Sequence, residues 1–528
     1  MKKYISSKFW FLFFSILFVL FATLSAIGSQ FLKGSLLDTV LDKNSSQAIH
    51  LGLFLAITVL LEIVFYYGFD IYRFKFTTGI AFVLRKDFIS SVLSKPFPVF
   101  SNKNSGEYIS EFTNTIRLIN DSYIAVIPLL VEVIIKSIFV TISLFILDYR
   151  IAIITVILLT APLCIPKLIE NKLQSLQEAE LDSLERMVTL ATGWLKGFEL
   201  IKNNSLEKII RDKFGLSNIE TMHAAFSFRK LTALSKSIST LLSYASHLII
   251  LFIAAYFVLT GEFSAGTFFI AISLIDQLSY PILSTSEFIK ELLSTKGIAE
   301  ELIQLTASQD ARKGVTLDQN FINKVSFEDV CFGYEEGKPL LNKFCLEAHI
   351  GDHYLLRGKN GSGKTTAMNL LLDYYKPQSG IILINDIPVS EIINLYDIIS
   401  IQRQDNIFFQ DTLFNNLTLY QPIAKERVID ELNAFGLYKY SNEAALEEII
   451  AENGANFSGG EKRRFALLRE ILQDKPILIL DEPFANIDKE SIVKIEERIN
   501  DLSDKIIFLI SHQQIEGNLK VDKQVSLL

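Results

Sequence analysis

A glycine-rich stretch in the second half of the chain carries residues whose types and spacing could do chemistry. Residues 358–366 read GKNGSGKTT, which fits the phosphate-binding pattern G-x-x-x-x-G-K-[ST]. The apolar segment HYLLR precedes it and the helical pattern AMNLLLDYY follows it, as the motif requires. Glycines let backbone N–H groups turn inward around phosphate oxygens. We therefore expect nucleotide binding by Gly358, Asn360, Gly361, Ser362, Gly363, Lys364, Thr365 and Thr366, with a plain glycine-rich turn as the alternative.

Two side chains of this loop are expected to have distinct roles. Lys364 supplies a positive charge to the β- and γ-phosphates of ATP, and the Thr365 hydroxyl ligates the Mg²⁺ that accompanies ATP. Because the pattern alone also occurs by chance, these roles need support from elsewhere in the chain.

An acidic pair provides part of that support. The segment ILILDEP at residues 477–483 is an apolar strand that ends in Asp481 and Glu482. Sheets of this type bind ligands at the carboxyl ends of their strands. We expect Asp481 to hold Mg²⁺ through a water molecule and Glu482 to act as the general base that activates the attacking water. An acidic pair on the protein surface is the alternative.

The segment FSGGEKRRFALLRE at residues 457–470 resembles the signature of the ATP-binding cassette family. The resemblance implies that a turn of Ser458, Gly459, Gly460 and Glu461, at the start of a helix, binds the γ-phosphate of a nucleotide held by the other subunit. Phe457 and Glu461 stand where leucine and glutamine are usual. We expect neither replacement to touch the Ser-Gly-Gly turn.

Five further residues match landmarks of the same family, in the same order along the chain. The resemblance implies that Tyr334 stacks on adenine, that Gln404 reaches Mg²⁺ and the attacking water, and that His512 contacts the γ-phosphate. Glu452 falls in the acidic loop before the signature, and Asp488 in the loop that meets the opposite subunit. The expected catalytic residues are therefore Glu482, His512 and Gln404, and the expected Mg²⁺ ligands are Thr365, Gln404 and Asp481.

The first half of the chain consists of long apolar runs. Hydrophobic residues make up 50% of the 528 residues and charged residues 21%, and the mean hydropathy is +0.32, which a soluble protein of this size seldom reaches. A helix needs about 20 residues to cross a bilayer. Six runs are long enough: residues 9–28, 49–71, 123–147, 151–169, 238–259 and 265–284.

The connections between these runs differ in charge. Residues 73–121 hold seven Lys and Arg and residues 167–237 hold eleven, whereas the connections on the other side hold three. Because basic loops stay in the cytoplasm, we predict a multi-pass protein of the plasma membrane with both termini and the ATPase domain in the cytoplasm. The basic stretches have helical patterns, and twenty residues would extend a helix about 30 Å beyond the bilayer.

The membrane half resembles the exporter branch of the family. Residues 97–114 and 197–214 are similar to its two cytoplasmic loops, and residues 256–282 to its fifth-to-sixth helix turn. The resemblance implies a six-helix, exporter-type transmembrane domain followed by an α/β P-loop nucleotide-binding domain. We place these over residues 1–305 and 318–528, with a linker at residues 306–317.

One chain offers six spans and half of each ATP site, so the resemblance implies a dimer. None of the ATP-site residues that we identify is degenerate, which favours a homodimer over a pairing with a second half-transporter. The expected partners are ATP with Mg²⁺, membrane lipid and an unidentified transported substrate. The net charge of −8 argues against nucleic acid.

The function that fits these features is ATP-driven export of a peptide, drug or other amphipathic compound. A siderophore-type importer on the same scaffold and a membrane-anchored ATPase or signalling module stay open as alternatives. Ionisable groups inside a bilayer are costly and usually face protein or water, and four lie in predicted spans: Glu62, Glu132, Lys136 and Asp276. They favour a polar or amphipathic cargo, although Glu132 and Lys136, four residues apart, could simply pair with each other.

Overall fold

The computed structural model describes the chain from Met1 to Leu527, except for residues 102, 161–168, 307–313, 336, 360, 405, 452–453 and 512–518. The chain divides into two compact units. The first consists of Met1–Ser94 and Lys103–Ser308, and the second of Lys95–Asn102 and Gln309–Leu528. The predicted linker at residues 306–317 therefore includes residues outside the described part.

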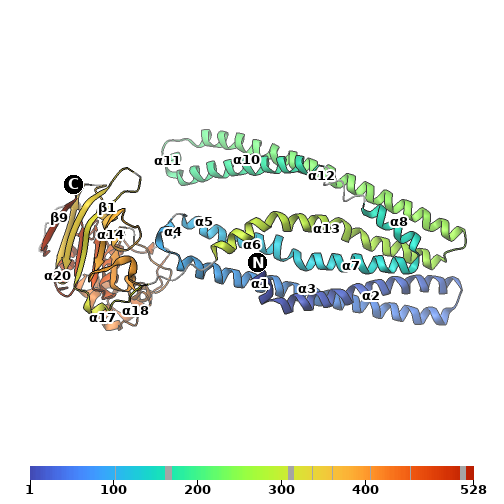
Figure 1. Ribbon diagram of the computed structural model, residues 1–528, viewed down its shortest axis with the longest axis horizontal. Coiled ribbons are helices and arrows are strands. Elements are labelled where there is room, and N and C mark those ends of the chain that lie inside the picture. Colours follow the sequence, from blue (N-terminus) through green and yellow to red (C-terminus); the bar gives the residue numbers. More distant parts are fainter. Residues whose placement is uncertain are drawn as a thin grey trace. The chain divides into compact units, whose positions relative to one another are not determined.

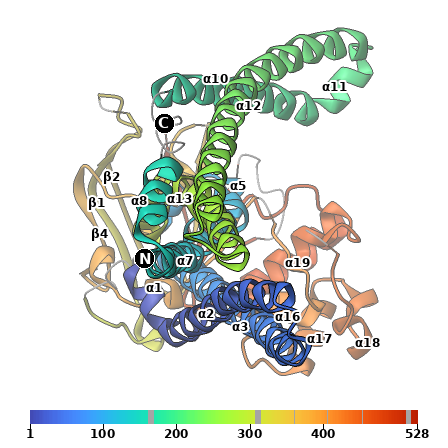
Figure 2. The same ribbon diagram turned by 90° about the vertical axis from the view of Figure 1, so that its right-hand side faces the viewer.

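The described residues of the first unit form helices (Figure 1). Their bounds are α1 (Lys2–Ser7), α2 (Phe9–Leu41), α3 (Ser45–Ser94), α5 (Ser105–Ser110), α6 (Ile116–Ile119), α7 (Val126–Leu147), α8 (Tyr149–Thr160), α10 (Glu170–Lys196), α11 (Phe198–Asn203), α12 (Glu207–Leu259) and α13 (Ala265–Leu305). Two π-helical turns, Glu111–Thr115 and Asn120–Ile124, join α5, α6 and α7. Seen end-on in Figure 2, α2 lies beside α3, and the two helices are in contact along their length.

Five helical stretches of the described chain are long and apolar enough to cross a membrane: Phe9–Leu41, Ser45–Ser94, Ser105–Leu147, Glu207–Leu259 and Ala265–Leu305. They contain the first, second, third, fifth and sixth predicted spans. The fourth predicted span starts as α8 and then enters residues 161–168, which lie outside the described part, so the count of six stays a prediction. The 53 residues of α12 would extend about 80 Å, well beyond a hydrocarbon core of about 30 Å.

The ion pair that the sequence offered as an alternative is present inside the first unit. The Lys136 ammonium lies 2.6 Å from Glu132 Oε1, and the Tyr66 hydroxyl donates to the same oxygen at 3.0 Å. Glu132 is 5% exposed. A buried carboxylate needs such partners, and these two bonds satisfy that need within the protein.

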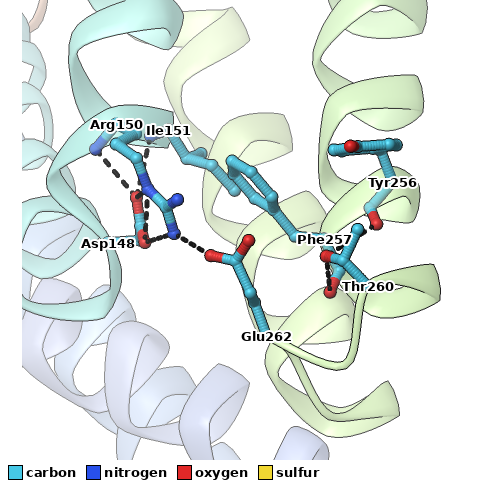
Figure 3. Close-up of polar contacts among 7 residues, drawn as sticks. All are labelled: Asp148, Arg150, Ile151, Tyr256, Phe257, Thr260 and Glu262. Atoms are coloured by element: carbon cyan, nitrogen blue, oxygen red, sulfur yellow. Dashed lines mark hydrogen bonds and ion pairs between the residues drawn. The ribbon is translucent and has the colours of Figure 1, made fainter.

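A second charged cluster joins the turn after α7 to the turn before α13 (Figure 3). The Arg150 guanidinium donates to Asp148 Oδ2 at 2.9 Å and to Glu262 Oε2 at 2.7 Å. It also lies 4.2 Å from the ring centre of Phe257, near the end of α12. Arg150 therefore ties together two helix–helix connections that are more than a hundred residues apart in the chain.

Helices α2 and α13 approach closely because glycines face each other. A Cβ at Gly34 would lie 2.6 Å from the carbonyl oxygen of Gly266 and would also meet the side chain of Ile270. One turn later on α2, the Asp38 carboxylate accepts from the backbone N–H of Gly266 at 2.7 Å and from the Ser264 hydroxyl at 2.6 Å. A carboxylate at a helix start accepts hydrogen bonds from free N–H groups and interacts favourably with the positive end of the helix dipole.

The second unit is an α/β structure built on two sheets (Figure 1). Its helices are α4 (Phe97–Ser101), α14 (Lys364–Leu371), α15 (Leu395–Ile398), α16 (Leu413–Thr418), α17 (Lys425–Ala434), α18 (Glu443–Leu446), α19 (Gly459–Leu472) and α20 (Lys489–Asn500). Its strands are β1 (Lys324–Phe332), β2 (Leu341–His349), β3 (His353–Gly358), β4 (Ser379–Ile384), β5 (Ile387–Pro388), β6 (Ile399–Gln402), β7 (Ile477–Asp481), β8 (Ile506–Ile510) and β9 (Lys523–Leu527).

The first sheet is antiparallel with the order β2-β1-β4-β5, and the second is parallel with the order β6-β7-β8-β3-β9. Strand β7 is buried along its whole length and serves two hydrophobic cores. Ile477 and Ile479 pack in the core with α14 and the antiparallel sheet, whereas Leu478 and Leu480 pack in the core with α17, α19 and α20. Alternation of side chains along a strand explains why one apolar run fills both cores.

Replacing Gly34 with alanine should lower the thermal stability of the purified protein, because the added Cβ would overlap Gly266 and Ile270 across the helix contact. Gly28→Ala on the same helix is the matched control, since a Cβ there meets no described atom within 4 Å. Alanine otherwise favours a helix over glycine by about 1 kcal/mol. Thermal unfolding of both variants in one detergent measures the difference. Equal stability of the two variants would contradict the close approach of α2 and α13.

Candidate ATP-binding and hydrolysis site

The phosphate loop links β3 to α14. Gly361 and Gly363 have φ angles of +81° and +95°, a left-handed conformation that glycine adopts at little cost. A Cβ at Gly363 would also come within 2.9 Å of Leu341. The two glycines therefore let the chain turn tightly enough to point backbone N–H groups into the space before α14.

Lys364 is the first residue of α14 and is 5% exposed. Its ammonium donates to the carbonyl oxygens of Gly358 at 2.8 Å and of Lys359 at 3.0 Å, which hold the charge over the loop. Burial lowers the pKa of Lys364 from its ordinary value, while the nearby carboxylates of Asp481 and Glu482 oppose that change. A phosphate beside the ammonium would favour its charged form further.

The end of β7 brings the acidic pair to this loop. The Thr365 hydroxyl donates to Asp481 Oδ2 at 3.3 Å, although the two residues are 116 positions apart. Strand β7 pairs with β8 and β8 pairs with β3, all in parallel, so the ends of β3 and β7 lie at one edge of the sheet. Thr365 and Asp481 together offer the hydroxyl and carboxylate oxygens that Mg²⁺ prefers.

Glu482 leaves the strand in a strained conformation. Its φ is +50°, in the left-handed region that residues with a Cβ rarely adopt. Its N–H donates to Ile510 O at 2.9 Å and its carbonyl accepts from the Arg463 guanidinium at 3.0 Å, so both sides of the residue are held. Gln404 Nε2 lies 3.5 Å from Glu482 Oε2. Such strain at a carboxylate is typical of a functional position.

These residues surround a cavity of about 580 Å³. The Tyr334 hydroxyl lies 3.1 Å from Thr366 Oγ1 at its rim. The buried Ser362 Oγ has no hydrogen-bond partner among the described residues. The predicted residues that line the cavity are Tyr334, Gly361, Ser362, Gly363, Lys364, Thr365, Thr366, Gln404, Asp481 and Glu482.

Three predicted residues lie outside the described part of the chain: Asn360, Glu452 and His512. Asp488 is described and caps α20, where its carboxylate accepts from the backbone N–H of Ser491 at 2.9 Å. That hydrogen bond lowers the pKa of Asp488 below its ordinary value. Asp488 therefore has a local structural role that the sequence did not indicate.

The signature segment forms a capped helix start. Ser458 is the N-cap of α19, and its Oγ accepts from the N–H of Glu461 at 3.3 Å, while the Glu461 carboxylate accepts from the N–H of Ser458 at 2.9 Å. This is a capping box. Gly459 has open space on its Cβ side within the described structure.

The expectation that Glu461 does not touch the Ser-Gly-Gly turn is wrong, because its carboxylate closes the turn. The Tyr440 hydroxyl also donates to Glu461 Oε1 at 2.9 Å. Partial burial raises the pKa of Glu461, but the bonds from Ser458 and Tyr440 outweigh it and the pKa is lowered overall. Phe457 packs against Tyr440 and Phe465, with ring centres 5.5 Å and 4.9 Å away.

Tyr440 and Arg463 position site residues without lining the cavity, and neither was predicted from the sequence. Arg463 lies five residues after Ser458 on α19 and reaches the Glu482 carbonyl, so helical spacing from the signature could have suggested it. Tyr440 belongs to a short 3₁₀ turn at Tyr438–Tyr440, and nothing in its local sequence indicates a contact with α19.

A phosphate loop, an acidic pair with a glutamine and a bundle of long apolar helices define an ATPase joined to a membrane domain, the construction of an ATP-driven membrane transporter. Comparison with known proteins agrees. Residues 12–282 match the family of the ABC transporter transmembrane region, and residues 341–485 match the ABC transporter family. The chain belongs to the ATP-binding cassette transporters, and its ATPase unit is coupled to the movement of a substrate across a membrane.

Several relatives span most of the chain. The lactococcin-G-processing and transport ATP-binding protein of Lactococcus lactis is 25% identical over 504 residues, which cover 93% of this chain and 71% of that protein. The ATP-dependent lipid A-core flippase of Syntrophus aciditrophicus is 25% identical over 81% of this chain and 73% of its own length. The structure of a bacterial Atm1-family ABC exporter with ATP bound shares the fold, with a TM-score of 0.81 at 18% identity over 94% of this chain and 90% of that one.

Replacing Glu482 with glutamine should lower ATP turnover by about 10²–10⁴-fold, because the variant keeps the shape of the site but lacks a base. Nucleotide affinity should stay near that of the unchanged protein. Lys364→Ala should instead weaken nucleotide binding itself, since its charge no longer meets the phosphates. Steady-state hydrolysis and equilibrium binding of a fluorescent ATP analogue separate the two effects. Glu490→Gln, on an exposed face of α20, is the control. Near-normal hydrolysis in Glu482→Gln would contradict the assignment.

Proposed function

We propose that this chain forms a homodimer in the plasma membrane that exports an amphipathic compound, with its termini and ATPase units in the cytoplasm. Two ATP molecules would lie between the two ATPase units. Each would contact the phosphate loop of one chain and the Ser458–Gly459–Gly460 turn of the other. The basic loops at residues 73–121 and 167–237 support this orientation.

One observation carries the proposal. Lys364, Thr365, Gln404, Asp481 and Glu482 line one cavity, whereas among the described residues Ser458, Gly459, Gly460 and Glu461 do not line it. The turn is nevertheless ready for an anion, since it stands at the start of the 14-residue helix α19. In the described part of the chain, the phosphate-loop cavity lacks the Ser458 turn, and the Ser458 turn lacks a phosphate-loop cavity. Two copies of the chain would therefore supply to each other the part that each cavity lacks.

The residues present fit Mg²⁺ with ATP. The Thr365 hydroxyl and the Asp481 carboxylate lie together, Gln404 lines the same cavity, and Ser362 Oγ is a buried polar atom without a partner among the described residues. When bound, Mg²⁺ would reduce the negative charge on the phosphate oxygens. Thr365, Asp481 and Gln404 are the residues that would hold it.

The chain's own groups supply the rest of the hydrolysis chemistry. Lys364 holds the β- and γ-phosphates, and Tyr334 offers an exposed ring to adenine at the rim of the cavity. Gln404 and Glu482 orient a water molecule, and Glu482 takes its proton. His512 is proposed to contact the γ-phosphate.

A stacked set of side chains would transmit a movement of Gln404 to the membrane unit. The Phe97 ring of α4 lies flat on Tyr374, with ring centres 4.0 Å apart at 18°. The Arg403 guanidinium, next to Gln404 in the chain, lies 5.7 Å from the Tyr374 ring centre and donates to Asn369 at 2.7 Å. Since α4 follows α3 directly in the chain, movement at Gln404 would displace the end of a membrane helix.

The relatives support an amphipathic cargo. Their names include lactococcin-G processing and transport, a lipid A-core flippase and a putative multidrug export protein. We take amphipathic compounds to be the class that such names have in common. The shared scaffold therefore fits export of that broad class.

Reconstituted vesicles test both function and direction. ATP added outside should drive a fluorescent amphipathic cargo into vesicles whose ATPase units face outward, and the cargo should stimulate ATP hydrolysis. Glu482→Gln in the same vesicles should move none, because binding without hydrolysis cannot sustain transport. ATP-driven loss of cargo from these vesicles would indicate import. Hydrolysis that no cargo alters, without any movement, would indicate a membrane-anchored ATPase.

A further inference from the structure

A cavity of about 650 Å³ opens between α12 and α13, within the predicted fifth and sixth spans. This volume is in the range of small-molecule binding sites. Much of its wall is apolar and comes from Leu248, Leu251, Ile272 and Ile275. Three polar side chains, His247, Asp276 and Ser279, gather on one side of it.

The contact with a backbone carbonyl places a hydrogen on Nδ1 of His247. Nδ1 lies 3.0 Å from the carbonyl oxygen of Ser243, which can only accept, so Nδ1 donates. In the neutral ring Nε2 is then an acceptor, and it takes the hydroxyl hydrogen of Ser279 at 3.1 Å. Neutral His247 therefore has no hydrogen to offer Asp276, although Nε2 lies 3.4 Å from Asp276 Oδ1.

Asp276 presents a carboxylate to the cavity. Its side chain is 69% exposed, and His247 is the one basic group within ion-pair distance of it among the described residues. The Glu132 carboxylate differs, because Lys136 and Tyr66 already satisfy it. An ionised group at this depth is costly unless it faces water or a partner, so the cavity favours a positively charged occupant.

Tyr244 adds a second feature for a cation. It lines the same cavity from α12 and is 68% exposed. The face of an aromatic ring attracts an ammonium or guanidinium group, while the four aliphatic side chains suit an apolar body.

We infer that this cavity is a cargo subsite for an amphipathic cation, in which Asp276 pairs with an ammonium or guanidinium group and the aliphatic wall holds the apolar part. The inference rests on the proposed function, since it names the class of compound that the exporter takes up. Ser279 contacts His247, and the Asp276 carboxylate lines the cavity with most of its side chain exposed, where a cationic cargo can reach it.

Direct binding to the complete protein in lipid nanodiscs, without nucleotide, tests the subsite. The probe is the tripeptide amide N-acetyl-Leu-Phe-Lys with a tritiated acetyl group, and its matched partner carries norleucine in place of lysine. The unchanged protein should bind the lysine probe at least tenfold more tightly, a difference of about 1.4 kcal/mol. Empty nanodiscs provide the correction for partition into lipid.

Asp276→Asn should abolish the preference for the lysine probe, whereas Asp276→Glu should retain part of it. Asp42→Asn, at the exposed C-cap of α2, is the matched acidic control and should keep the full preference. Equal binding of the two probes to the unchanged protein, binding of neither, or an intact preference in Asp276→Asn would each overturn the subsite.

The vesicle assay distinguishes this failure from failure of the proposed function. If the lysine probe is transported with ATP but Asp276→Asn keeps the preference, export stands and the subsite is wrong. If binding depends on Asp276 but ATP drives no movement, the subsite stands and export is wrong.

Discussion

The parallel pairing of β7 with β8 and of β8 with β3 is the constraint on which the ATPase unit depends. It brings the end of one strand, with Asp481 and Glu482, beside the loop that follows another, with Lys364 and Thr365. The hydrogen bonds of Glu482 extend the same pairing by one residue. Its N–H donates to the carbonyl oxygen of Ile510 in β8, and its carbonyl oxygen accepts from Arg463. A residue with a Cβ in this conformation costs roughly 1–2 kcal/mol, and the two bonds offset that cost while turning the carboxylate into the cavity.

The same sheet also explains why, under the proposed function, a single chain would have an incomplete ATP site. Helix α19 packs through Phe465 and Leu468 into the core on the other face of β7, which fixes where its start can lie. Its capping box and the bond from Tyr440 keep the Ser-Gly-Gly turn in shape for an anion. A firmly held helix start away from the chain's own phosphate cavity would serve the proposed function if a partner supplied the phosphate. The proposal of a dimer rests on that separation.

Much of this arrangement was predictable from the sequence, because its chemistry depends on short motifs. The loop at residues 358–366 and the strand ending in Asp481 each have a recognisable local pattern, and parallel strands place their carboxyl ends together. The apolar runs predicted membrane helices for a similarly simple reason, since about 20 residues are needed for a span. The pairing of Glu132 with Lys136 was one of two open interpretations, and helical spacing favoured it.

The remainder depends on contacts between distant segments, which local patterns do not encode. Glu461 was expected to leave the turn untouched, yet a carboxylate accepts from a helix N–H as readily as an amide oxygen does, so it closes the capping box. The stack of Phe97 on Tyr374 and the gathering of His247 with Asp276 arise from tertiary packing. Phe97, Tyr374 and His247 have ordinary sequence contexts, whereas Asp276 stood out in the sequence as an ionisable residue in a predicted span but without a partner.

The most direct test of the central claim compares two purified heterodimers, each selected by a different affinity tag on each chain. The first pairs a Gly459→Asp chain with a Lys364→Ala chain, and the second pairs an unchanged chain with a chain that carries both substitutions. Aspartate at Gly459 has room within its own chain but would repel a γ-phosphate. If each ATP site combines two chains, the first heterodimer keeps one intact site and hydrolyses ATP, whereas the second has a defect in both sites and does not. Hydrolysis by the second heterodimer and none by the first would contradict the shared site.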